Sequence, residues 1–341
     1  MLQTVKFGKF SGMNNINEDY ELPHDVPRRV VNADVLDSGR LKRREGSSQM
    51  LALAKPHSLW GDGGATAYFI LNNQVRRFLP DGTSTLVGNF AAGDNRVSYV
   101  EVNGEIYLTC KTARGKISSG VLKSWGIDVP ASPPVLTTTV GTLPAGTYHA
   151  SVTYLMADGR ESGDSALAKI TLAAGGGITT LSMPVSADAN VTKKRLYLST
   201  ADGEVMNMAA EVAAADQFAT CSAQPTGAKL RTAHLTPPPF GKALAYYNGQ
   251  IFITDAADPR IVWHTEPLDY DHVDTRKNYY QYGEPVTVIA GVCWTAYMCA
   301  PTRLTSCRWQ EKKRQGSARS VRLARLKVLL RQSQIHRALS G

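Results

Sequence analysis

The 341-residue sequence lacks paired cysteines, long apolar runs and a high share of aromatic side chains. Its five cysteines are odd in number and form no Cys-x-x-Cys pair, so we expect reduced thiols and no disulfide framework. No apolar run approaches the ~20 residues that a membrane-spanning helix needs, and residues 1–10 lack the apolar core of a signal peptide. We therefore expect neither a membrane protein nor a secreted one.

Sites for catalysis, metals and cofactors are also missing. Gly175–Gly177 has no Lys-Ser/Thr after it, so it does not form a phosphate loop. The spacing of Cys293, Cys299 and Cys307 is unlike the clamps that hold zinc. The best catalytic candidates are four carboxylates in one turn-rich segment, which is more simply explained as a solvated loop: Glu266, Asp269, Asp271 and Asp274. We expect no enzyme, no metal and no cofactor.

Charge is concentrated at one end of the chain. Residues 293–341 hold eleven Lys/Arg and a single acid, Glu311, whereas residues 1–292 hold 27 basic and 28 acidic residues. The net charge of +9 therefore describes the end of the chain, while the rest is close to neutral. A nucleic-acid-binding surface over the whole protein is not indicated.

Short strands joined by tight turns begin near Ala65, and one unit recurs. Asn103-Gly104 and Asn248-Gly249 each stand between two apolar alternating stretches, which predicts a β-hairpin with a type I′ turn. A looser third copy surrounds Asn72-Asn73. The first interval is 31 residues and the second is 145, so the sequence predicts an insertion between the last two copies.

Prolines bound the expected insertion, at Pro133-Pro134 and at Pro237–Pro239. About 100 residues lie between them, and removing these leaves ~45, the length of a four-stranded propeller blade. Inside the insertion, alternation over Gly146–Tyr154 and further strand-like stretches favour a fibronectin- or immunoglobulin-like β-sandwich. For the Ala-rich stretch Met206–Ala215 a helical turn is considered, and its conformation is left open.

We therefore expect an all-β protein, a partial β-propeller interrupted by a sandwich. The expected divisions are an N-terminal arm with the first strands (1–50), a first propeller part (51–133), the inserted sandwich (134–233), a second propeller part (234–292) and a basic tail that is poorly ordered or helical (293–341).

Several short motifs together resemble one family of virion proteins. They are Phe10–Asn15 and Asn32–Gly46 near the start, Gly146–Tyr148, Val152–Tyr154, Asp158–Ser162 and Lys194–Tyr197 in the insertion, and Trp263–Tyr270 after it. These stretches are similar to the tail-nozzle or packaged-DNA-stabilisation proteins of short-tailed phages. The resemblance covers residues 7–292.

The resemblance implies a non-enzymatic structural subunit of a phage or prophage virion, assembled in the bacterial cytoplasm. Its partners would be other head and tail proteins and further copies of itself in a ring, through which packaged DNA passes without sequence-specific contact or any membrane role. The alternative is a soluble carbohydrate- or protein-binding propeller with an accessory fibronectin-like domain. Its candidate surface is the aromatic cluster of Tyr279, Tyr280 and Tyr282.

The family pattern stops at Val292, where the acids and most glycines disappear. We expect residues 293–341 to be an out-of-frame translation of a longer gene, and the competing interpretation is a genuine nucleic-acid-binding tail. Leucines at helical spacing over residues 320–339 would make a basic amphipathic helix. Its candidate nucleic-acid contacts are Arg322, Arg325 and Lys327.

Overall fold

The computed structural model describes residues 8–14, 16–46, 48–64, 66–292, 295–299 and 304–307. These residues form antiparallel sheets, none of them closed, and one 3-10 turn, η1 (Asp19–Glu21). The all-β class expected from the sequence is confirmed. The chain falls into two compact units, Met1–Leu53 and Ala54–Gly341.

The first unit is held by hydrogen bonds and ion pairs. Strands β1 (Ala33–Val35) and β2 (Leu41–Arg43) form a hairpin, and the Phe10 amide donates to the Gly39 carbonyl at 2.8 Å. Gly39 is the single buried residue among those described in this unit. Apolar burial therefore contributes little to its stability.

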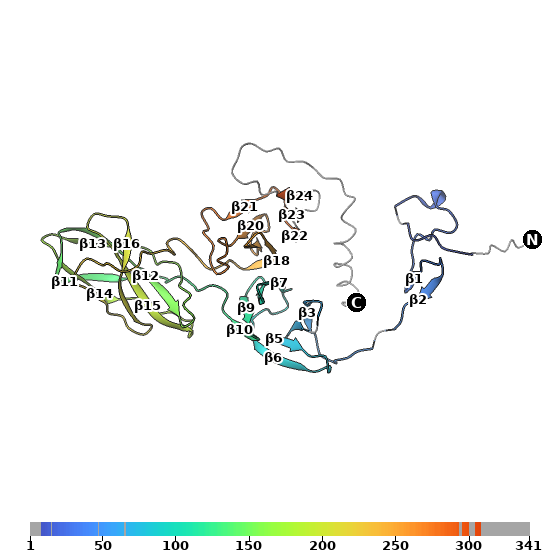
Figure 1. Ribbon diagram of the computed structural model, residues 1–341, viewed down its shortest axis with the longest axis horizontal. Helices are drawn as coiled ribbons and strands as arrows, with labels where there is room; N and C mark the ends of the chain where they lie inside the picture. The colour runs from blue at the N-terminus through green and yellow to red at the C-terminus, as the bar shows by residue number, and fades with distance from the viewer. Residues whose placement is uncertain are drawn as a thin grey trace, which may run out of the picture. The chain divides into compact units, whose positions relative to one another are not determined.

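In the second unit, four of the sheets have their strands adjacent in chain order (Figure 1), and of these three have four strands and one has three. The first is β3 (His57–Gly61), β4 (Ala67–Leu71), β5 (Gln74–Phe78) and β6 (Ser84–Asn89). The second is β7 (Ser98–Val102), β8 (Glu105–Thr109), β9 (Arg114–Ser118) and β10 (Val121–Lys123). The third is β18 (Gly241–Tyr247), β19 (Gln250–Asp255), β20 (Ile261–His264) and β21 (Tyr279–Gln281). The last is β22 (Val288–Val292), β23 (Thr295–Cys299) and β24 (Leu304–Cys307).

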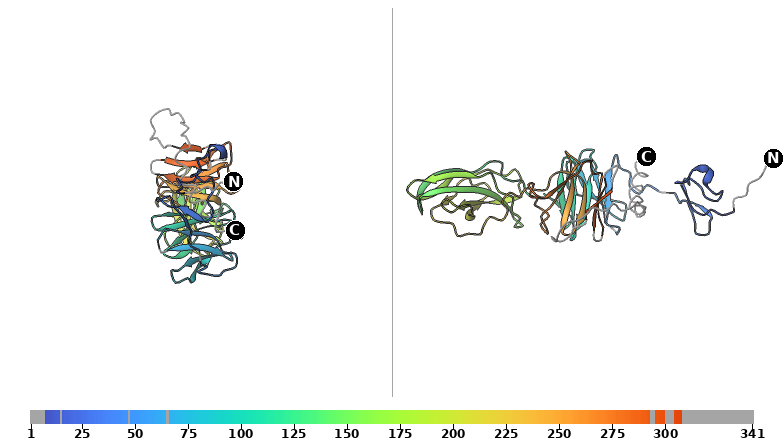
Figure 2. Two further views of the ribbon diagram at one scale, coloured as in Figure 1. Left: turned by 90° about the vertical axis from the view of Figure 1, so that its right-hand side faces the viewer. Right: turned by 90° about the horizontal axis from the view of Figure 1, so that it is seen from above.

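These sheets pack against one another in chain order, and in the left view of Figure 2 they follow each other from blue to orange-red. Ile70 of β4 and Leu108 of β8 are fully buried in one apolar cluster between the first two sheets. Tyr107 and Ile251 belong to the cluster between the second and third. A further cluster joins the third sheet to Ile289 of β22.

Serine hydroxyls link the first strands of neighbouring sheets. Ser58 Oγ accepts a hydrogen bond from the amide of Val97 at 2.9 Å, and Ser98 Oγ accepts one from the amide of Leu244 at 3.0 Å. Each hydroxyl satisfies an amide at a sheet boundary that has no ladder partner there. The sheets are therefore joined by a repeated polar contact as well as by apolar packing.

The two Asn-Gly pairs occupy hairpin turns at the same place in their sheets. Asn103 and Gly104 have φ of 53° and 77°, and Asn248 and Gly249 have 47° and 74°. These are the two left-handed positions of a type I′ turn. Both turns connect the first and second strands of a sheet, β7 to β8 and β18 to β19.

The third copy lies elsewhere in its sheet. Asn72 and Asn73 also have positive φ, of 50° and 61°, but they connect β4 to β5, the second and third strands. The interval of 31 residues is therefore not the repeat of the sheets, and treating Asn72 as equivalent to Asn103 is wrong. Turn chemistry identifies a hairpin but carries no information about which hairpin of a sheet it is.

The segment between the second and third sheets forms two sheets with a shared core. One contains β11 (Val135–Leu143), β14 (Gly176–Ser182) and β17 (Thr220–Cys221). The other contains β13 (Ala168–Leu172), β12 (Gly146–Met156), β15 (Val191–Ser199) and β16 (Met206–Ala213). We call residues 135–221 the module. Tyr148, Ala150 and Val152 alternate along β12 and are fully buried against Ile178 of the opposite sheet.

The structure decides one segment that the sequence analysis left open and corrects the expectation for another. The Ala-rich stretch is the strand β16, paired with β15. Residues 295–299 form a strand that pairs with β22, and residues 304–307 form a strand that pairs with residues 295–299, so a helical tail is wrong for these residues. Strand β22 lies beside β18 and offers an edge on which the chain continues pairing past Val292.

A buried lysine in the module gives the first testable prediction. Lys194 of β15 is fully buried, its ammonium donates to the Pro184 carbonyl at 3.3 Å, and burial lowers its pKa despite the opposing charge of Asp216. Replacing a buried charge with an apolar side chain of similar length removes its desolvation penalty. We expect Lys194→Met to raise the free energy of unfolding by about 1 kcal/mol or more, measured by urea denaturation. A loss of stability in this variant would contradict that account of Lys194.

Candidate functional site

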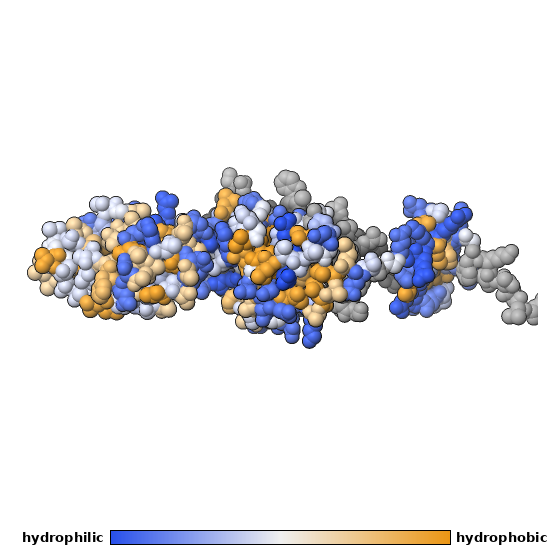
Figure 3. Space-filling view, turned by 90° about the horizontal axis from the view of Figure 1, so that it is seen from below, coloured by the Kyte–Doolittle hydropathy of each residue, from blue (hydrophilic) through white to orange (hydrophobic). Residues whose placement is uncertain are grey.

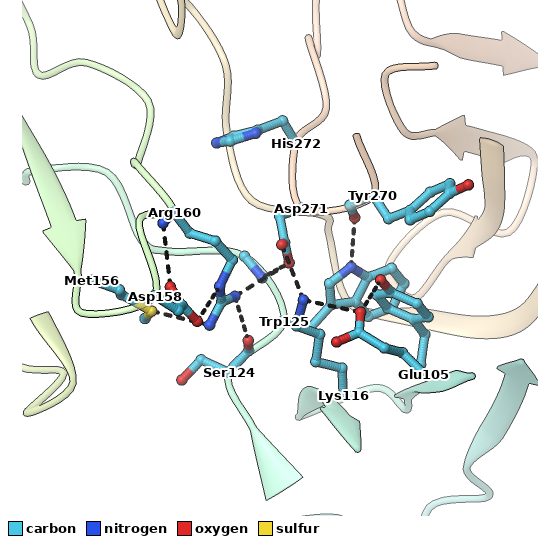
Figure 4. Close-up of polar contacts among 12 residues, drawn as sticks. Glu105, Lys116, Ser124, Trp125, Met156, Asp158, Arg160, Tyr270, Asp271 and His272 are labelled. Atoms are coloured by element: carbon cyan, nitrogen blue, oxygen red, sulfur yellow. Dashed lines mark hydrogen bonds and ion pairs between the residues drawn. The ribbon is translucent and has the colours of Figure 1, made fainter. Parts of the chain in front are cut away.

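The densest group of buried charges lies where the module meets the second and third sheets (Figure 4). We call this group the polar junction and define it by six side chains. They are Glu105 of β8, Lys116 of β9, Asp158 and Arg160 of the turn after β12, and Asp271 and His272 of the segment after β20.

Asp271 is the centre of the polar junction. Its Oδ2 accepts a hydrogen bond from Lys116 Nζ at 3.2 Å. Its Oδ1 accepts from the Gly126 amide at 3.0 Å and from an Arg160 guanidinium nitrogen at 3.4 Å. One carboxylate thus joins a strand of the second sheet, the segment that enters the module and a turn of the module.

Lys116 is nearly inaccessible, with 7% of its side chain exposed. Its second partner is Glu105 Oε2 at 3.3 Å, and its ammonium lies 5.6 Å from the centre of the Tyr107 ring. Burial acts to raise the pKa of Glu105, but hydrogen bonds from Tyr107 and Ser118 and the charge of Lys116 lower it overall. Glu105 therefore stays ionised and compensates the buried ammonium.

Arg160 connects three parts of the chain through one planar group. Nε donates to Asp158 Oδ2 at 2.9 Å, and the terminal nitrogens donate to the Ser124 carbonyl at 3.0 Å and to Met156 Sδ at 3.1 Å, besides Asp271. A guanidinium can satisfy this many acceptors because its five N–H groups point outward in one plane. Arg160 therefore links the turn after β12 to the segment that leads from the second sheet into the module.

His272 makes the second polar link to the module. Its side chain is 8% exposed, Nδ1 lies 2.7 Å from Asp269 Oδ2, and Nε2 lies 2.7 Å from the backbone carbonyl of Glu161 in the module. Burial acts to lower the pKa of His272. The Asp269 carboxylate, the Glu161 carbonyl and the charge of Asp271 outweigh burial and raise it.

Aromatic rings close the polar junction on the side of the sheets. Trp125 is fully buried, donates its indole N–H to the Tyr270 carbonyl at 2.6 Å and packs edge-on against Tyr107 at 5.2 Å. Tyr107 also packs edge-on against Tyr270. The charged contacts therefore lie beside a low-dielectric wall, where they are stronger than in water.

The four carboxylates considered for catalysis are all engaged in ion pairs. Asp271 and Asp269 belong to the contacts above, Glu266 pairs with Lys277 at 3.2 Å, and Asp274 pairs with Arg276 at 2.8 Å. The bond from Arg276 lowers the pKa of Asp274. The pKa of Asp269 is also lowered, because the bond and charge of His272 outweigh its burial. A catalytic general acid needs the opposite shift, so neither group is suited to that role.

The other candidate positions are dispersed. Tyr280 and Tyr282 pack against the cluster between the last two sheets, while Tyr279 is 43% exposed beside Trp263. Arg322, Arg325 and Lys327 lie outside the described residues. Within the part of the chain that the structure describes, no group of three or more His, Cys, Asp or Glu side chains is arranged to hold a metal ion.

Sequence reasoning missed the polar junction. Lys116 and Arg160 are separated from Asp271 by 155 and 111 residues, and no local motif connects them. The one available signal was the short run of acids around Asp271, which a solvated loop explains equally well.

Comparison with known proteins finds no matching family model and no curated protein of significant similarity. Among the described residues no helix is long and apolar enough to cross a membrane.

Proposed function

We propose that this chain is a non-enzymatic structural subunit of a phage tail, of the tail-nozzle or packaged-DNA-stabilisation kind. Its sheets would form part of a β-propeller, and the module would be a fibronectin-like domain inserted between two blades. Support comes from the motifs that resemble this family and from consecutive four-stranded meanders packed in chain order. The observation that carries the proposal is an uncharged outer face on the module.

The two sheets of the module differ in charge. Strands β11, β14 and β17 contain no charged residue, whereas the opposite sheet carries Lys169, Lys193, Arg195 and Glu211. On the opposite sheet, Arg195 bonds to Glu161 at 2.7 Å and to Glu211 at 2.9 Å, as expected of a solvated face. Charge is thus absent from one side of the module only.

The uncharged face exposes apolar side chains beside a row of threonines. Thr137 pairs with Thr179, and Thr179 pairs with Thr220 at 2.9 Å between hydroxyl oxygens. Leu181 of β14 and Phe218, two residues before β17, are 52% and 69% exposed. In Figure 3 much of the visible module surface is pale or orange, whereas residues 8–53 are mostly blue. A face depleted of charge with an exposed aromatic ring is typical of the centre of an interface.

The occupant that fits this face best is a further copy of this chain. A face without charged side chains brings no like charges together when copies associate, and it needs no complementary charge on the surface that it meets. The polar junction keeps the orientation of the module fixed, so that contacts made by the module are transmitted to the sheets. Residues 1–292 are close to neutral, which suits a channel that releases DNA.

The proposal predicts self-association through the module. We expect the full chain to form oligomers at micromolar concentration and Phe218→Glu or Leu181→Glu to lower the mass by burying an unpaired charge at the interface. Light scattering coupled to size-exclusion chromatography measures this. Lys193→Ser, on the charged face, is the matched control and should leave the mass unchanged.

A monomeric wild-type chain, or equal dissociation by Lys193→Ser, would contradict the structural role of this face. The alternative of a carbohydrate-binding propeller needs an exposed aromatic cluster, and of the three tyrosines considered only Tyr279 is substantially exposed. Retention of the monomer on a glycan column, lost in Tyr279→Ala, would favour that alternative.

A further inference from the structure

His272 stands apart from the rest of the polar junction because both of its ring nitrogens face acceptors. Nδ1 lies 2.7 Å from Asp269 Oδ2 and Nε2 lies 2.7 Å from the Glu161 carbonyl oxygen. A peptide carbonyl can only accept, and an ionised carboxylate can only accept. A neutral imidazole carries one N–H and satisfies one of these contacts, whereas an imidazolium satisfies both.

We infer that His272 is a buried imidazolium that clamps the module to the third sheet, and that loss of its second proton loosens this connection. The clamp spans two parts of the chain, because Asp269 belongs to the segment after β20 and Glu161 to the turn after β12 of the module. This inference is independent of the proposed virion role. It makes the orientation of the module sensitive to pH.

The surrounding charges favour the protonated state. From its own segment His272 faces Asp269 and Asp271, and from the module it faces the Glu161 carbonyl. Behind Asp271 lie Lys116 of β9 and Arg160 of the module, with Glu105 and Asp158 as their further partners. The pKa values of Asp269, Asp158 and Glu105 are lowered whereas that of His272 is raised, so among these four groups the histidine is the one that titrates above pH 6.

The direction of the pH effect follows from the pKa shifts of His272 and Asp269. The pKa of His272 is raised above its ordinary value of 6.5, so its stabilisation is complete below that pH and is lost as the pH rises through the raised value. The pKa of Asp269 is lowered from 3.8, so its contribution is lost only as the pH falls below that range. The clamp is therefore strongest in mildly acidic solution and weakens toward alkaline pH.

A second histidine provides a matched control. His264 is partly buried, and its Nδ1 lies 2.9 Å from the side-chain amide nitrogen of Gln250, a donor, and 3.2 Å from the Thr265 carbonyl oxygen. Burial lowers the pKa of His264 despite the Thr265 carbonyl and the charge of Glu266. We expect His264 to be neutral at the pH at which His272 is charged.

The first experiment is nitrogen-15 NMR of the histidine rings in the full chain between pH 5 and 10, with His272→Gln and His264→Gln used to assign the signals. We expect both nitrogens of His272 to be protonated at pH 7 and those of His264 to have the pattern of a neutral ring. A neutral His272 at pH 7 would overturn the inference.

The second experiment measures the opening of the junction as limited proteolysis of residues 124–134 and 222–240 in the full chain. At each pH the cleavage rate of His272→Gln is divided by the cleavage rate of the wild type. This ratio is the protection that His272 provides, and it is free of the pH dependence of the protease. A charge-assisted hydrogen bond corresponds to about a tenfold change in the opening equilibrium, so we expect about tenfold protection at pH 6 that disappears by pH 9.

His264→Gln should retain the wild-type profile. If His272→Gln does not fold, Asp269→Asn supplies the comparison, since it removes the carboxylate partner and keeps the ring. Protection that is constant between pH 6 and 9, or equally lost in His264→Gln, would overturn the inference. These readouts do not depend on oligomerisation. The inference can therefore fail while the proposed function stands, and the proposed function can fail while the inference stands.

Discussion

Asp271→Ala is expected to lower the free energy of unfolding by about 3 kcal/mol, because it leaves two buried cations without their shared carboxylate. Lys116 is then paired only with Glu105, and its side chain is 7% exposed. Arg160 and the Gly126 amide lose the same acceptor. Denaturation in guanidinium chloride, followed by circular dichroism, measures the change.

Asp158→Ala is the control for this variant. It removes another carboxylate partner of Arg160, but the Asp158 side chain is 41% exposed and lies at the edge of the polar junction. A pair of this kind contributes about 1 kcal/mol or less. Equal losses for the two variants would show that Asp271 is not the centre of the junction.

Gly163→Ala should be the most damaging single-methyl change at the module boundary. A Cβ at this position would overlap the carbonyl oxygen of Leu235 and lie 2.9 Å from Val129 Cγ1. The overlapping oxygen belongs to the backbone of the segment that leads from the module back to the third sheet, so the overlap is relieved only if the module moves away from that segment. We expect a loss of about 1–3 kcal/mol and faster proteolysis of residues 222–240.

The matched control is Gly283→Ala, because a Cβ there meets nothing within 4 Å. It should change the unfolding midpoint little. A wild-type midpoint for Gly163→Ala would mean that the returning segment is not held against the module as the structure describes.

Local sequence chemistry was sufficient for the strands and their turns. Asn103-Gly104 and Asn248-Gly249 have the left-handed φ of their turn type because glycine lacks a Cβ and the short polar side chain of asparagine tolerates it, a property of two adjacent residues. Alternation along Gly146–Tyr154 marked the buried face of β12 for a similarly local reason. The all-β class followed from such stretches taken one at a time.

Local chemistry failed where the outcome depends on position in a sheet or on an available edge. The turn at Asn72 has the expected geometry but belongs to the second hairpin of its sheet. Residues 295–299 form a strand beside β22 and residues 304–307 form the next strand of the same sheet, and composition alone suggested neither. An antiparallel edge accepts a further strand through its backbone groups, with little demand on side chains.

The polar junction was decided by the tertiary structure alone. Asp271 appeared in the sequence as one acid of a turn-rich segment, and its partners Lys116 and Arg160 stand 155 and 111 residues away. Burial makes such a contact strong. A local sequence pattern cannot predict it, because the residues adjacent in sequence do not show whether an aspartate is exposed or buried. The hairpins could therefore be predicted from the sequence, because their energetics are local. The polar junction and the imidazolium of His272 form only when segments that are distant in sequence pack together and exclude water.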